Sequence, residues 1–132
     1  MDRLCLRQSI GCKKGGRGMI AVIIGGAIGT FFRFVFGEWL KETTVNAPFP
    51  MAIIIINISG SFGLGLTVSI ISPDSSVCLF LATGFFGAFT TFSAFSMEAF
   101  DLIKKRAFMK AGLYLFLTAA GTVIAFWTGR HL

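Results

Sequence analysis

Charged residues are scarce in this 132-residue chain, at 14% of the total, whereas soluble proteins contain about a quarter. Hydrophobic residues make up 55%, and the mean hydropathy is +0.80. This balance excludes a water-soluble globular domain, and the length is too short for two domains.

Residues that carry catalytic or metal chemistry are also few. His131 is the single histidine and has no plausible nucleophile near it, and no Gly-rich phosphate loop follows a strand. Cys5, Cys12 and Cys78 form no CxxC pair, and no His/Cys cluster completes a zinc site. We therefore expect that the chain is not an enzyme.

The net charge of +6 does not indicate a nucleic-acid partner, because five of the twelve Lys and Arg residues lie in the first 18 positions. Most of the others flank apolar runs, a pattern typical of membrane topology. We expect residues 1–18 to form a basic N-terminal extension. Whether translation starts at Met1 or Met19 stays open.

Four long apolar runs predict four transmembrane helices and an all-α membrane protein. At about 1.5 Å per residue, each run is long enough to cross a hydrocarbon core of about 30 Å. The predicted spans are Met19–Phe36, Phe49–Ile71, Val77–Phe100 and Ala107–Thr128. They leave no other segment long enough to bury a core of its own.

The third span contains a segment, Gly84–Ser93, that is unusually rich in Gly and Thr. We predict a helix break near its middle, between Gly87 and Thr90. Such a break leaves backbone carbonyls without helical partners inside the bilayer, where only protein or an ion can satisfy them. A small cation is one candidate.

Lys and Arg are evenly divided between the two sides of the membrane that four spans define. The side of the termini carries Arg3, Arg7, Lys13, Lys14, Arg17 and Arg130, and the loop side carries Arg33, Lys41, Lys104, Lys105, Arg106 and Lys110. An even count favours insertion in both orientations and an antiparallel, symmetric dimer. If translation starts at Met19, the side of the termini keeps one basic residue against six on the loop side, and the orientation is fixed.

Three polar residues within or near the spans are candidates for function. Asn57 either joins helices by hydrogen bonds or replaces part of an anion's hydration shell. Arg33, predicted three residues from the end of the first span, either reaches the lipid headgroups or places a positive charge at the mouth of an anion path. Glu98 is expected to pair with a Lys or Arg.

Further candidates lie in the third and fourth spans. Phe92 and Phe95 share a helix face beside the Ser93 hydroxyl, and the electropositive ring edges can face an anion, although such rings more commonly face lipid or core. A polar stripe in the fourth span should face protein or water; it consists of Tyr114, Thr118 and Thr122. Ser59 with Gly63, and Ser61 with Gly65, are spaced for close helix packing.

Three segments, Gly25–Phe34, Asn57–Phe62 and Gly84–Glu98, resemble the Fluc or CrcB family of bacterial fluoride channels, and the likeness covers Met19 to the end. The resemblance implies that residues 19–132 form a four-span, fluoride-selective channel. Its expected role is passive export of cytoplasmic fluoride, and so fluoride resistance, as a multi-pass protein of the cell membrane.

The resemblance also implies a dual-topology homodimer with two antiparallel pores. A structural, non-transported Na⁺ would be held by the backbone carbonyls of Gly87 and Thr90 from both subunits. The fluoride path would use Asn57, Phe92, Ser93 and Phe95, with Tyr114, Thr118 and Thr122 as a polar track. A heterodimer with an oppositely oriented paralogue stays open.

Two alternatives account for less of the sequence. A small four-span drug/proton antiporter needs a membrane-embedded carboxylate, but the first span carries Arg33 and no acid. A structural subunit without transport activity leaves the Gly/Thr-rich segment and the polar stripe unexplained.

Overall fold

The computed structural model describes residues 16–44, 46, 50–72 and 75–132. These residues contain four helical segments that are long and apolar enough to cross a membrane: Arg17–Thr43, Met51–Ile70, Ser76–Lys104 and Phe108–His131. The four predicted spans are therefore confirmed as helices. Nearly all of the predicted N-terminal extension, residues 1–15, lies outside the described residues.

Helix α2 (Arg17–Thr43) is longer than predicted. The apolar run ends at Phe36, but the helix continues through an exposed turn in which Lys41 and Glu38 form an ion pair at 3.0 Å. In its last turn the Thr43 hydroxyl donates to the carbonyl of Trp39 at 2.9 Å. The helix thus continues on polar residues beyond the predicted apolar span, and Arg33 lies well inside α2.

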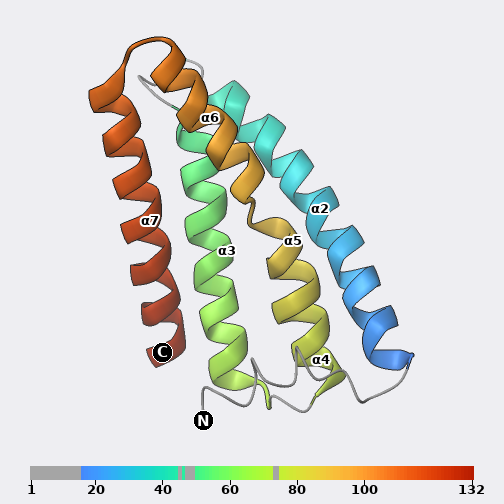
Figure 1. Cartoon of the computed structure of the whole chain (residues 1–132). Coiled ribbons are helices and arrows are strands. Elements are labelled where there is room, and N and C mark those ends of the chain that lie inside the picture. Colours follow the sequence, from blue (N-terminus) through green and yellow to red (C-terminus); the bar gives the residue numbers. More distant parts are fainter. Residues whose placement is uncertain (1–15, 45, 47–49, 73–74) are drawn as a thin grey trace.

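The third span is interrupted, as predicted. It consists of α4 (Ser76–Cys78), a π-helix η1 (Leu79–Phe86), α5 (Gly87–Phe89) and α6 (Phe92–Lys104). Thr90 (φ −72°, ψ 146°) and Thr91 (φ −140°, ψ 122°) are extended, and the chain changes direction there (Figure 1). One detail was wrong: Gly87 is helical, and the break lies at Thr90 and Thr91.

The four spans pack as two close pairs. Helix α3 (Met51–Ile70) lies along α7 (Phe108–His131), and α2 lies along η1 and α5 (Figure 1). In the first pair the backbones touch, since a Cβ atom on Gly65 would meet the carbonyl oxygen of Phe126. The start of α2 and the end of α7 lie at the same end of the bundle, as an even number of spans requires.

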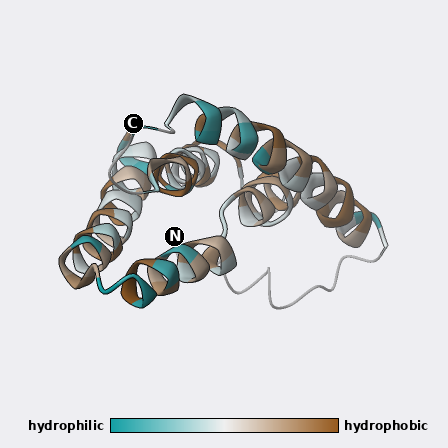
Figure 2. Ribbon diagram, turned by 90° about the horizontal axis from the view of Figure 1, so that it is seen from above, coloured by the Kyte–Doolittle hydropathy of each residue, from teal (hydrophilic) through white to brown (hydrophobic). Residues whose placement is uncertain are grey.

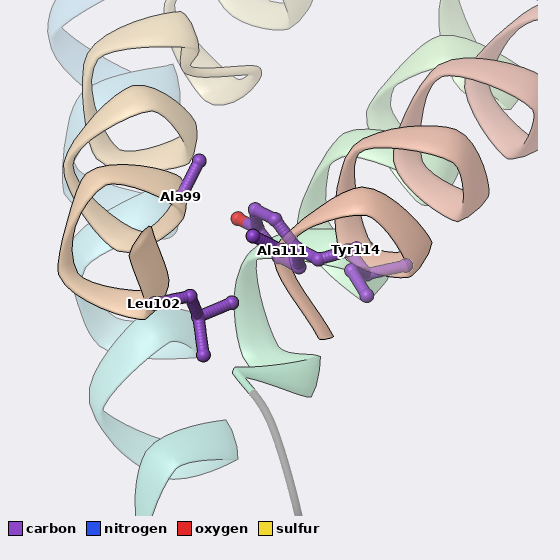
Figure 3. Packing of buried hydrophobic residues seen from close by; sticks show 5 residues of the cluster. Ala99, Leu102, Ala111 and Tyr114 are labelled. Carbon is purple, nitrogen blue, oxygen red and sulfur yellow. The ribbon is translucent and has the colours of Figure 1, made fainter. Parts of the chain in front are cut away.

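Many large hydrophobic residues are exposed on the surface of the chain. Ile23, Phe34 and Trp127 are each 66% exposed, and the ribbon coloured by hydropathy shows hydrophobic stretches along the long helices (Figure 2). The main buried cluster lies where α6 meets α7 (Figure 3) and contains Ile54, Ala99, Leu102, Ala111 and Tyr114. Exposed apolar faces on helices of this length are those of a multi-pass membrane protein.

Candidate functional site

Asn57 on α3 connects that helix to the break in the third span. Its side chain is 6% exposed; its Oδ1 accepts from the Thr91 backbone N–H at 2.9 Å, and its Nδ2 donates to the Thr91 carbonyl at 3.2 Å. The amide thus replaces the helical partners that the extended residue has lost. Interhelical hydrogen bonding, one of the two predicted roles of Asn57, is present, and one Nδ2 proton remains for another acceptor.

The same arrangement frees two backbone carbonyls. In a continuous helix, the Thr91 N–H would donate to the carbonyl of Gly87, but it donates to Asn57. The Ala94 N–H would donate to the carbonyl of Thr90, but it donates to Thr91 Oγ1 at 3.4 Å and caps α6. The carbonyls of Gly87 and Thr90 therefore lack their normal helical partners.

A groove of about 320 Å³ lies beside the break, between α3, α6 and α7. Its lining residues are all uncharged: Asn57, Ser61, Leu64, Thr90, Thr91, Phe92, Phe95, Thr118, Ala119 and Thr122. Five of the residues predicted for an anion path line this groove: Asn57, Phe92, Phe95, Thr118 and Thr122. Thr90, one of the two predicted cation-binding residues, lines it as well. It combines polar groups and phenyl rings without any fixed charge.

The two phenyl rings differ in how firmly they are held. The centroids of Phe92 and Phe95 are 5.8 Å apart, and Phe95 stacks on Tyr114 at 5.4 Å. Phe92 is 79% exposed, so its ring reaches away from the rest of the chain. Phe95 is therefore fixed by α7, whereas within the described residues Phe92 makes its one ring contact with Phe95.

Tyr114 is fully buried, and its hydroxyl donates to Glu98 Oε2 at 3.3 Å. The expected pairing of Glu98 with a basic residue is not found in the described part of the chain, where the one ion pair joins Lys41 and Glu38. Tyr114 and Thr118 face protein, as predicted for the polar stripe. Tyr114 lies behind Phe95 and is not part of the groove wall.

Besides Tyr114, three predicted residues lie away from the groove wall. Ser93 and Gly87 are exposed, and Arg33 is half-buried on α2. A Cβ atom on Gly87 would meet nothing closer than the carbonyl oxygen of Ala82, at 3.6 Å, so the space over this residue is open. Within the part of the chain that the structure describes, none of the three lines the groove.

Two polar residues of the groove, Ser61 and Thr91, had not been assigned to a site from the sequence. Ser61 was interpreted as a packing residue, yet it follows Asn57 by four positions and so lies on the same face of α3. That spacing was a usable signal. Thr91 gave no such signal, because its place depends on where the helix breaks.

No group of three or more His, Cys, Asp or Glu is placed to hold a metal in the part of the chain that the structure describes. Hard cations also bind to main-chain carbonyl oxygens. The unpartnered carbonyls of Gly87 and Thr90 fit that donor chemistry.

Comparison with known proteins identifies relatives over most of the chain. The family model described as CrcB-like protein, Camphor Resistance (CrcB), matches residues 20–130. Fluoride-specific ion channel FluC 1 of Halalkalibacterium halodurans is 40% identical over 120 residues, which cover 86% of this chain and 94% of that protein. Fluoride-specific ion channel FluC of Chlorobium chlorochromatii is 37% identical over 117 residues, covering 84% and 88%. The resemblance predicted from the three sequence segments is confirmed.

Proposed function

The chain belongs to the CrcB family, and on this premise we propose that it is a fluoride-selective channel. The single observation that carries the proposal is the uncharged groove beside the helix break, lined by Asn57, two phenyl rings and several hydroxyls. Relatives named fluoride-specific ion channels support the choice of ion. The antiporter alternative gains no support from them.

The groove suits a small, strongly hydrated anion. Entry requires that water molecules be replaced by donors held in a narrow, rigid path, and release requires that no single donor bind too tightly. Amide N–H and hydroxyl groups supply such donors without a positive charge, and phenyl edges add weak electropositive contacts. A ring of Lys or Arg would hold the ion more strongly and favour larger anions as well. Half-buried Arg33 does not line the groove, and its positive charge would attract anions to the protein only from a distance.

We propose that two copies in opposite orientations form the functional channel. Phe92 is 79% exposed, and Gly87 and Ser93 are also uncovered in one chain. A partner packed over this side would enclose the groove and bring all three residues into the interior. The equal number of basic residues on the two sides supports insertion in both orientations. Passive movement through such pores would export cytoplasmic fluoride down its electrochemical gradient and confer fluoride resistance at the cell membrane.

We further propose a structural Na⁺ at the interface between the two copies. The carbonyls of Gly87 and Thr90 have lost their helical partners, and each unsatisfied group in the bilayer costs several kcal/mol. Two such oxygens from each of two symmetry-related chains would surround the ion. When bound, the ion would be coordinated by these oxygens and would join the subunits. It is a fixed part of the assembly and not a transported ion.

Fluoride efflux tests the channel directly. Liposomes that contain only the purified protein should release fluoride when valinomycin and K⁺ supply an electrical shunt, because a channel moves charge without a coupled ion. Chloride should move far more slowly in the same vesicles. Efflux that requires a proton gradient, or equal passage of chloride, would contradict the proposal.

The sodium proposal predicts an effect on assembly. Replacing Na⁺ with N-methylglucamine should lower both activity and the fraction of dimer measured by light scattering, with no Na⁺ flux during conduction. Gly87→Leu should weaken the dimer as well, although the side chain has room within one chain. Gly112→Leu is the matched control, because no atom lies within 4 Å of a Cβ atom there. An intact, active dimer after exhaustive Na⁺ removal would overturn the proposal.

A further inference from the structure

Three threonine hydroxyls near the groove donate their single proton to backbone carbonyls of the preceding helical turn. Thr118 donates to the carbonyl of Tyr114 at 2.8 Å, and Thr122 donates to that of Ala119 at 2.9 Å. Thr90 donates to the carbonyl of Phe86 at 3.0 Å. A hydroxyl has one proton, so these groups present mainly oxygen lone pairs to the groove. Lone pairs repel an anion.

Ser61 differs from these hydroxyls. Its side chain lines the groove, and among the residues that the structure describes it makes no hydrogen bond, whereas Ser59 on the same helix donates to the carbonyl of Ile56 at 3.0 Å. Ser61 lies one turn after Asn57, which still has one unused Nδ2 proton. Thr91 Oγ1 acts as an acceptor in its bond from Ala94, so its proton is also unused.

We propose that Ser61 is a specificity-determining donor of the anion path, acting together with the unused amide proton of Asn57. This inference rests on the proposed function, because it names the groups that replace the water around the ion. The Asn57 amide and the Ser61 hydroxyl lie one helical turn apart on α3 and provide two neighbouring donors along the groove wall. The Thr91 hydroxyl, at the break, provides a third. The hydroxyls of Thr118 and Thr122 contribute shape and polarity but not the principal donor protons.

The test compares two serines on one helix. Ser61→Ala should lower the initial rate of fluoride efflux by about tenfold or more, because a hydrogen bond to a charged group is worth more than a neutral one. It should also lower the ratio of fluoride to chloride efflux. Ser61→Thr keeps the hydroxyl and should restore most of both quantities. Ser59→Ala, whose hydroxyl is bonded to its own helix away from the groove, should match the unmodified protein.

The possible outcomes separate this inference from the proposed function. If the unmodified protein does not conduct fluoride, the proposed function fails. If the unmodified protein conducts and a folded, dimeric Ser61→Ala protein has the same rate and selectivity, the Ser61 inference fails while the channel proposal stands. A loss in Ser61→Ala that Ser61→Thr does not restore would also contradict a donor role.

Discussion

Replacing Asn57 with Asp should lower fluoride efflux by about a hundredfold or more, the largest effect that we expect from any single polar substitution. Asn57 both accepts from and donates to Thr91. Asp keeps the acceptor but places a carboxylate oxygen against the Thr91 carbonyl, where the amide had donated. A buried charge without a partner costs several kcal/mol, and the same charge would repel an anion in the groove.

The chain provides a matched control for this change, because its two asparagines lie in different environments. Asn46 is exposed in the connection between α2 and α3, so Asn46→Asp makes the same chemical change and should leave efflux unaltered. Gel filtration of both variants would separate a folded channel that cannot conduct from one that has not assembled. Normal efflux from Asn57→Asp would show that neither the contact with Thr91 nor the amide donor is needed.

The four spans were predictable because a membrane imposes a simple requirement of length and apolar composition. The helix break was predictable because Gly and Thr residues have a low propensity for the interior of a regular helix. The span ends were less predictable, as α2 shows by continuing to Thr43. Beyond the apolar run, composition no longer marks the helix, and its last turns carry only weak exposed contacts such as the Lys41–Glu38 pair.

The details of the site could not be obtained from local patterns. The bonds between Asn57 and Thr91 join residues 34 positions apart, and no periodicity predicts such a pairing. The π-helix Leu79–Phe86 also has no sequence signature of its own. Whether a hydroxyl donates to a carbonyl of its own helix or points into the groove depends on its side-chain rotamer. The sequence places Ser61 on the same face of α3 as Asn57, but it does not show that the Ser59 hydroxyl is bonded to its own helix and the Ser61 hydroxyl is not.

The contact between α2 and the π-helix depends on backbone atoms approaching without side chains between them. A Cβ atom on Gly25 would meet the carbonyl oxygen of Phe80, and it would lie 3.1 Å from the backbone nitrogen of Phe85 and 3.2 Å from Cα of Gly84. None of these atoms belongs to a side chain that can rotate away. The close approach of α2 to the third span just before the break thus depends on glycine.

Gly25→Ala should therefore destabilise the folded protein by about 1–3 kcal/mol, the usual cost of overpacking a close contact, and should lower efflux through loss of folded channel. Gly26→Ala is the control from the next position on the same helix, because the nearest atom to its Cβ is the Gly84 carbonyl oxygen at 3.9 Å. That variant should stay within about 0.5 kcal/mol of the unmodified protein, because 3.9 Å is an ordinary van der Waals distance that needs no movement of the neighbouring atoms. Unfolding in SDS, followed by circular dichroism, measures both. Equal stabilities would show that α2 can move away from the π-helix at little cost, and that the close backbone contact does not position the break.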